Sequence, residues 1–154
     1  MMPKLYIALA LTLAALVLVG WVADGKPVHA ATLAVDTTAD NAALTACTGA
    51  AGDCSLRGAI IKANSTPVNP DTITLPAGTY SIGGTRSDDT ADTGDLDVTC
   101  LSVGCTSSAP LTINGAGAAN TIIDAGFSDR VFDMATAASN VTALNLNDLT
   151  ITQV

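Results

Sequence analysis

The second half of the chain repeats short, β-branched segments at nearly constant spacing. From Leu111 onward these segments begin at residues 111, 121, 131, 141 and 149, and turn-favouring residues separate them. Regularly spaced short strands predict an all-β fold. A β-sandwich is the common architecture of that kind, but Leu-Thr-Ile recurs at 111–113 and 149–151, which favours the stacked coils of a solenoid. The predicted strands are 32–35, 72–75, 79–82, 96–98, 111–113, 121–124, 131–134, 141–144 and 149–152.

The composition fits a core that is built from aliphatic side chains. Aromatic residues make up 3% of the chain, and after residue 30 only Tyr80, Phe127 and Phe132 remain. All 14 acidic residues are aspartates, which favour turns over helix surfaces. Because each coil of a solenoid buries aliphatic residues on the next coil, such a core does not need aromatic residues.

One segment, residues 55–64, has the periodicity of a short helix. Its apolar residues recur at i, i+3, i+4 and i+7, and so lie on one face. Ser55 suits the N-cap position, and Asn64 is expected to end the helix before Pro67. A helix this short is not stable alone, so its apolar face must pack on another element. The apolar residues are Leu56, Ala59, Ile60 and Ala63.

The same segment resembles a known motif. It is similar to the "CSLREA" motif at the N-terminus of secreted bacterial β-helix proteins, and segments 71–80, 93–98, 111–117, 121–124 and 129–133 are similar, in order, to that family's first strands and coils. The resemblance implies a right-handed parallel β-helix, pectin-lyase-like in shape, whose open N-terminal end is covered by the helix. It implies no particular activity. The residues that carry the motif are Cys54, Ser55, Leu56, Arg57, Gly58, Ala59, Ile60, Ala63 and Asn64.

The chain departs from this motif at Gly58, where the family has glutamate. With Ser55 as the N-cap, residue 58 is the third helical position, where glutamate completes a capping box. Glycine there also lowers helix propensity. The sequence therefore predicts that Gly58→Glu raises the melting temperature.

Residues 1–30 have the organisation of a secretory signal peptide. Lys4 precedes an apolar stretch over 5–19 that only Thr12 interrupts, and Val28-His29-Ala30 provides a cleavage site after Ala30. An uncleaved membrane anchor is the alternative, because the apolar stretch approaches the length of about 17–25 residues that spans a bilayer. The cleavage site favours a secreted or surface-exposed bacterial protein that is not held in the membrane after cleavage.

The four cysteines fit an oxidising compartment. Cys47 and Cys54 enclose one short loop, and Cys100 and Cys105 enclose another, so we expect disulfides within each pair. Four cysteines allow three connectivities, and the sequence does not select among them. A zinc site is the alternative, but no histidine follows residue 30 and the spacings are atypical of zinc sites.

The charge and the residue types exclude several classes of function. A formal net charge of −8 disfavours binding to nucleic acids, because a negative chain repels phosphate. With His29 removed, Ser-His-Asp and Cys-His nucleophile systems are absent from the sequence. Paired cysteines leave no free thiol, so no catalytic residue is assigned.

An aspartate-rich segment is the best candidate for a ligand site. Clustered carboxylates can hold calcium, the one cofactor that the sequence suggests. The segment departs from the EF-hand template at several ligand positions, and a solvated loop between coils is the alternative. The candidate calcium ligands are Asp88, Asp89, Asp92, Asp95 and Asp97.

A second cluster contains Asp124, Asp129, Arg130 and Asp133. Pectate-lyase-like enzymes of the resembled fold use calcium-binding aspartates and an arginine that takes a proton from a uronic acid, and Arg130 would be that base here. Surface ion pairs and turn caps are the structural alternative. Fold analogy alone does not assign the activity.

These features predict a signal peptide over 1–30, an N-terminal cap region over 31–70 with the helix at about 55–64, and the first β-helix coils over 71–154. The expected function is a non-catalytic structural or adhesive role at the cell surface, with polysaccharide or another surface as the partner. A calcium-dependent polysaccharide lyase, or another carbohydrate-active enzyme of this fold, is the alternative. Because strand 149–152 stops within a coil, we expect a fragment whose open end meets downstream coils or another subunit.

Overall fold

The computed structural model describes residues 29–66, 68–86, 90–99, 109–126, 130–134 and 143–153. Almost all of the expected signal peptide lies outside these residues. Within them, short strands alternate with turns, and α2 (Leu56–Ser65) is the only helix. The strands are β1 (Thr32–Ala34), β2 (Thr72–Thr74), β3 (Gly78–Ser81), β4 (Leu96–Asp97), β5 (Leu111–Asn114), β6 (Thr121–Asp124), β7 (Phe132–Asp133), β8 (Leu144–Asn147) and β9 (Thr150–Thr152).

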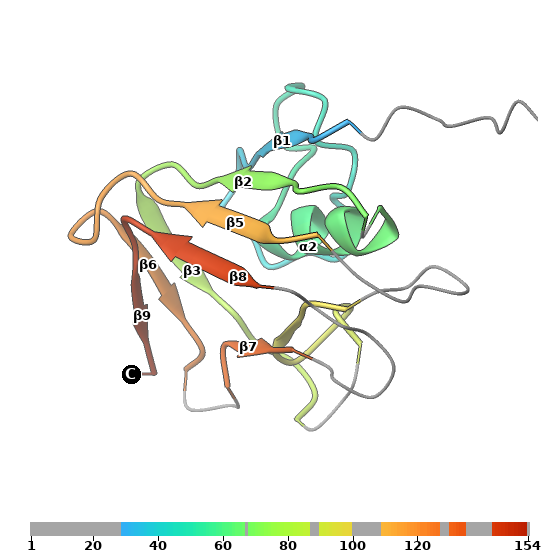
Figure 1. Ribbon diagram of the computed structural model, residues 1–154. Coiled ribbons are helices and arrows are strands. Elements are labelled where there is room, and N and C mark those ends of the chain that lie inside the picture. The colour runs from blue at the N-terminus through green and yellow to red at the C-terminus, as the bar shows by residue number, and fades with distance from the viewer. Residues whose placement is uncertain are drawn as a thin grey trace, which may run out of the picture.

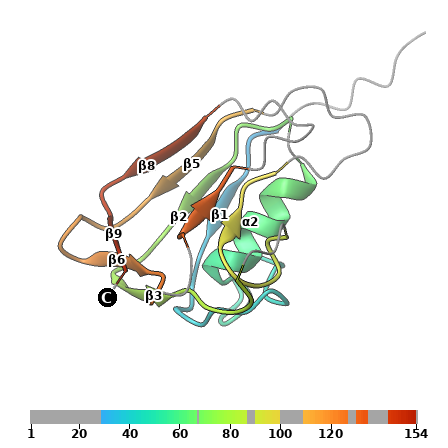
Figure 2. The same ribbon diagram turned by 90° about the horizontal axis from the view of Figure 1, so that it is seen from below.

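The strands form three parallel sheets, in the orders β1-β2-β5-β8, β3-β6-β9 and β4-β7. β2, β3 and β4 lie in three different sheets, and β5, β6 and β7 each pair with the corresponding earlier strand. Figure 1 shows the four strands of the first sheet side by side, and Figure 2 shows the same arrangement from below. The described part of the chain is therefore an all-β fold of parallel strands with little helix.

The first sheet buries one column of aliphatic side chains. Leu33, Ile73, Ile113 and Leu146 are aligned by the register of β1, β2, β5 and β8. Leu33, Ile73 and Ile113 are 3%, 0% and 0% exposed, whereas Leu146 is half-buried. Full burial of one such side chain stabilises the fold by roughly 1.5–3 kcal/mol. The sheet therefore holds its neighbours in register through this column, as well as through the backbone ladder.

The second sheet continues the core from β3 to β6, but β9 is less covered. Tyr80, Ile123 and Ile151 are aligned in register across the three strands. Tyr80 and Ile123 are 2% and 0% exposed, whereas Ile151 is 43% exposed. Burial raises the pKa of the Tyr80 phenol, and its hydroxyl donates to the Pro76 carbonyl at 3.0 Å. The apolar interior is thus closed at β3 and more open to solvent at β9.

Helix α2 begins where the sequence predicts. Ser55 is its N-cap, and its apolar residues Leu56, Ala59 and Ile60 are 2%, 0% and 0% exposed. These residues pack toward β2 and β4, which supplies the tertiary support that so short a helix requires. The helix runs to Ser65, so Asn64 lies inside its last turn and does not terminate it.

The strand predicted at 141–144 is misplaced. The structure has β8 at Leu144–Asn147, and residues 141 and 142 lie outside the described residues. Asparagine is depleted in strands, so the Leu-Asn-Leu-Asn segment does not predict a strand by composition. Pairing with β5 offsets the low strand propensity of asparagine, because Asn147 donates its side-chain amide to the Asn114 side-chain oxygen at 2.9 Å.

Candidate functional site

Two groups of polar residues stand out in the described structure. One surrounds the start of α2 and is referred to below as the cap, residues 36–64. The other is the acidic group, Asp95, Asp97 and Asp133, on and beside β4 and β7. The first contains the motif found in the sequence, and the second contains two of the predicted calcium ligands.

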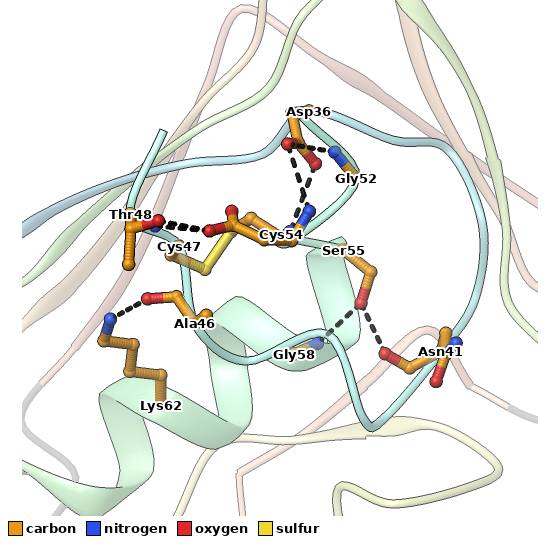
Figure 3. Close-up of a disulfide and its surroundings, with 11 residues drawn as sticks. Asp36, Asn41, Ala46, Cys47, Thr48, Gly52, Cys54, Ser55, Gly58 and Lys62 are labelled. Carbon is orange, nitrogen blue, oxygen red and sulfur yellow. Dashed lines mark hydrogen bonds between the residues drawn. A yellow bond between two sulfur atoms is a disulfide. The ribbon is translucent and has the colours of Figure 1, made fainter. Parts of the chain in front are cut away.

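Ser55 ties the start of α2 to the preceding loop. Its hydroxyl oxygen accepts a hydrogen bond from the Gly58 backbone N–H at 2.9 Å and donates to the Asn41 carbonyl at 2.6 Å (Figure 3). Its backbone N–H donates to the Leu44 carbonyl at 3.2 Å. The N-cap therefore orients the helix and also fixes the loop that crosses it.

The structure contradicts the expectation that glutamate at position 58 is stabilising. A Cβ added to Gly58 would lie 1.9 Å from the Leu44 carbonyl oxygen, where no side chain fits without movement of the backbone. Because the loop that contains Leu44 lies against this turn of the helix, glycine is required by close approach. A capping box involves residues of the helix alone, whereas this contact comes from a loop that is distant along the chain.

The loop that precedes α2 is closed by the Cys47–Cys54 disulfide, one of the two predicted pairs. The Asp36 carboxylate accepts hydrogen bonds from the backbone N–H groups of Gly52, Asp53 and Cys54 at 2.7, 3.2 and 3.1 Å (Figure 3). An isolated antiparallel bridge joins Thr45 to Cys54. This loop is a small, cross-linked structure, and the second pair, Cys100 and Cys105, lies outside the described residues.

Two further side chains stabilise the ends of this loop. The hydrogen bonds that Thr48 donates from its hydroxyl and backbone N–H lower the pKa of the Asp53 carboxyl, with the hydroxyl contributing most. Lys62 of α2 donates to the Ala46 carbonyl. The disulfide loop is therefore attached to the helix by side-chain contacts as well as by the chain itself.

Arg57 is the most extensively bonded side chain of the cap. It is 2% exposed, and its guanidinium pairs with Asp40 through two bonds, Nε to Oδ1 at 2.5 Å and Nη2 to Oδ2 at 2.9 Å. The other guanidinium hydrogens are donated to backbone carbonyls. Such a fork of donors is specific to arginine, and lysine cannot reproduce it. The carbonyl acceptors belong to Gly83, Ala91, Gly94 and Asp95, at 3.3, 3.0, 2.8 and 3.2 Å.

Asn64 makes a second connection from α2 to the same region. It is 2% exposed, donates its amide to the Asp97 carbonyl at 2.7 Å, and accepts from the Thr99 backbone N–H at 3.0 Å. Both bonds lie at the end of β4, because Asp97 is its last residue, whereas Arg57 binds carbonyls that precede β4. Arg57 and Asn64, both in the sequence motif, therefore fix the backbone on either side of β4 from one helix.

The acidic group combines two of the predicted calcium ligands with a residue from the other predicted cluster. Asp95 and Asp97 are fully buried, Asp133 is partly buried, and one ligand oxygen of each lies within 4.8 Å of the others. Asp97 and Asp133 are register partners in parallel strands. Of the other predicted ligands, Asp92 is exposed and is not part of this group, and Asp88 and Asp89 lie outside the described residues.

Arg130 contributes the positive charge beside this group. Its guanidinium pairs with Asp95 at 2.9 Å and with Asp133 at 3.4 Å, and its side chain is 52% exposed. Asp124, which was predicted to lie with these residues, instead accepts from the Gly126 backbone N–H at 2.9 Å in a turn. Asp129 lies outside the described residues.

The chemistry available to the acidic group is that of oxygen ligands and an ion pair. Three carboxylates are the donors that calcium or another hard cation prefers, so Asp95, Asp97 and Asp133 are the residues that would hold one. Arg130 already offsets part of their negative charge. Arg130 donates to two carboxylates here, which is the arrangement of an ion pair and not of a general base.

Sequence reasoning missed the meeting of Asp97 with Asp133 and the partners of Arg57. A signal for the first was available, because Leu96-Asp97-Val98 and Phe132-Asp133-Met134 share one pattern of apolar residue, aspartate and apolar residue. Asp40 had no comparable signal, because it lies in a loop and meets Arg57 only through the fold.

Comparison with protein-family models, curated proteins and solved structures gives no match for this chain. In the described part of the chain, no helix is long and apolar enough to cross a membrane.

Proposed function

We propose that this chain is an exported bacterial protein whose cap closes the N-terminal end of a right-handed parallel β-helix, with a structural or adhesive role at the cell surface. In this proposal the cap contains the motif of residues 54–64, and the strands that follow it are the first coils. The coils present an extended face to polysaccharide or another surface.

Export is supported by the organisation of residues 1–30. Lys4, the apolar stretch over 5–19 and the small residue at Ala30 have the order of a secretory signal. The Cys47–Cys54 disulfide is consistent with folding in an oxidising compartment. Both features favour a secreted or surface location over the cytoplasm.

The β-helix is supported by the order in which the chain visits its sheets. β2, β3 and β4 belong to three sheets, and β5, β6 and β7 return to the same three sheets in the same order. Parallel strands need crossover connections, and such crossovers are right-handed in nearly all proteins. A coil that returns to its starting sheet in this manner builds a solenoid.

The observation that carries the proposal is the attachment of α2 to the first of these strand sets. Arg57 and Asn64 bind backbone groups of residues 83, 91, 94, 95, 97 and 99, and Leu56 and Ile60 are buried at the same end. Backbone acceptors recognise the path of the chain and not a ligand. The motif therefore has the chemistry of a cap and not of an active site.

A partner is proposed for the opposite end of the strand sets. Ile151 is exposed although its register neighbour Ile123 is fully buried, and an open depression there is lined by residues 130–132 and 151–153, on and beside β7 and β9. The partner is a further coil, or another subunit, whose parallel strands continue the sheets at β8 and β9. Pairing there would cover Ile151 and the half-buried Leu144 and Leu146.

Cell fractionation tests the proposal. We expect an antibody against the cap to detect the protein in the culture medium and the surface fraction, at a size that shows loss of residues 1–30. Detection only in the cytoplasm, or only in the membrane at the full size, would overturn export. A marker protein that is confined to the cytoplasm provides the control for cell lysis.

A calcium-dependent polysaccharide lyase is the second candidate, favoured by the carboxylates of Asp95, Asp97 and Asp133 beside Arg130. This function predicts calcium-dependent cleavage of polygalacturonate that is lost in Arg130→Ala, measured by the absorbance of unsaturated products. The structural role predicts no cleavage with or without calcium. The assay therefore separates the two candidates directly.

A further inference from the structure

The outer side of the β1-β2-β5-β8 sheet has an ordered composition. Each strand alternates inward-facing side chains, buried in β1, β2 and β5 and half-buried in β8, with outward-facing side chains that are exposed or half-buried. The parallel register aligns the outward residues in two columns. The first column is Thr32, Thr72, Thr112 and Asn145, and the second is Ala34, Thr74, Asn114 and Asn147; together they are called the threonine–asparagine face.

This face is uncharged in a chain that is strongly acidic. The formal net charge is −8, yet none of the eight positions of the face is aspartate, lysine or arginine. The outer side of the neighbouring β3-β6-β9 sheet differs, because Asp124 lies there between Ser81 and Thr152 in register. The face therefore offers hydrogen-bond donors and acceptors to a ligand, but no charge.

Four of the eight side chains of the face are joined in pairs by hydrogen bonds. Asn147 donates to the Asn114 side-chain oxygen at 2.9 Å, and Asn145 donates to the Thr112 hydroxyl at 3.4 Å. Parallel strands lie about 4.7–4.9 Å apart, so each column repeats a hydroxyl or amide at that interval. A surface that is ordered before binding loses less conformational entropy when a ligand binds.

We propose that the threonine–asparagine face binds an extended, neutral polysaccharide chain that runs along the columns, perpendicular to the strands. The rings of such a chain follow one another at an interval close to one strand spacing, so each strand of the face can offer a hydroxyl or an amide to one ring. The excess of aspartate elsewhere on the chain repels acidic polysaccharides. This inference rests on the proposed surface role and specifies the ligand class and the face that binds it.

The test uses the secreted, disulfide-bonded protein and measures its depletion from solution by microcrystalline cellulose, and its retardation in gels that contain mixed-linkage β-glucan. The variant Thr74→Lys/Thr112→Lys places two charges on the face. The matched control, Thr79→Lys/Thr152→Lys, places the same two charges on the outer side of the neighbouring sheet. We expect the wild type and the control to bind alike, and the face variant to lose binding at least tenfold.

A second pair of variants separates a loss of binding from a loss of stability. If the face variant has a lower melting temperature than the control, the pair Thr112→Val and Thr79→Val removes one hydroxyl at each place without altering side-chain shape, and only Thr112→Val is expected to weaken binding. Failure of the wild type to bind either neutral polysaccharide would overturn the inference, as would equal binding by the face variant. Stronger binding to polygalacturonate, or growth-shaping of ice crystals without polysaccharide binding, would overturn the ligand class. The fractionation experiment is independent of all these outcomes, so export can hold where this inference fails.

Discussion

Arg57→Met is expected to be among the most destabilising single changes in the cap. Methionine keeps much of the apolar stem but removes every guanidinium donor, which leaves Asp40 and four buried or partly buried carbonyls without that partner. Removing one member of a buried ion pair typically costs about 3–5 kcal/mol. Because small domains are stable by only about 5–15 kcal/mol, a large part of the total stability is lost.

The assay is urea and thermal unfolding of the disulfide-bonded protein, followed by circular dichroism. For a chain of this size, about 4 kcal/mol corresponds to a fall in melting temperature on the order of 10–20 °C. Lys62→Met is the matched control, since Lys62 is a cation on the same helix that makes one exposed hydrogen bond. We expect the control to lose less than about 1 kcal/mol. A comparable small loss for Arg57→Met would refute the argument that this guanidinium fixes the cap.

Three further predictions concern the same region. Gly58→Ala should destabilise by about 1–3 kcal/mol or more, because its methyl group meets the Leu44 carbonyl; an unchanged melting temperature would show that the loop moves aside easily. Asn64→Ala should cost about 1–3 kcal/mol in urea unfolding through two lost buried hydrogen bonds, and wild-type stability would contradict their role. Replacing both Cys47 and Cys54 by alanine should cost about 2–3 kcal/mol from loop entropy, measured by thermal unfolding against the oxidised wild type, and a gain would contradict it.

Local features of this fold are readable from the sequence. The apolar spacing of residues 56–63 and the hydroxyl of Ser55 specify a helix start without reference to the rest of the chain, and the structure has both. Cys47 and Cys54 are close in sequence in a chain expected in an oxidising compartment, so their pairing is the favoured prediction, and the structure has it. Short β-branched segments between turn residues likewise predict most of the strands, because both signals are local.

Features that depend on contacts between distant segments were not predictable in the same way. The requirement for glycine at position 58 comes from the Leu44 carbonyl, and the role of Asn64 comes from the β4 backbone. Asp133 joins Asp97 only because β4 and β7 pair in parallel register across 36 residues. The contacts of Gly58 and Asn64 alter no local pattern, so propensity and periodicity contain no signal for them, and the shared pattern around Asp97 and Asp133 is the one signal for the third.

The acidic group illustrates the same limit for a candidate site. The sequence grouped aspartates by proximity along the chain and placed Asp133 with Asp124 and Arg130. The fold keeps Asp133 paired with Arg130, adds Asp95 and Asp97 to the group, and leaves Asp124 in a turn. Ligand sets assembled by sheet register can be proposed from sequence only when the register itself is predicted.

The most direct test of the central claim, that this is an exported and capped protein, is mass-spectrometric peptide mapping of the extracellular product without reduction. The account predicts an N-terminal peptide that begins at Ala31 and a linked pair of peptides that contain Cys47 and Cys54. A product that retains Met1, or that contains Cys47 and Cys54 as free thiols, would contradict it.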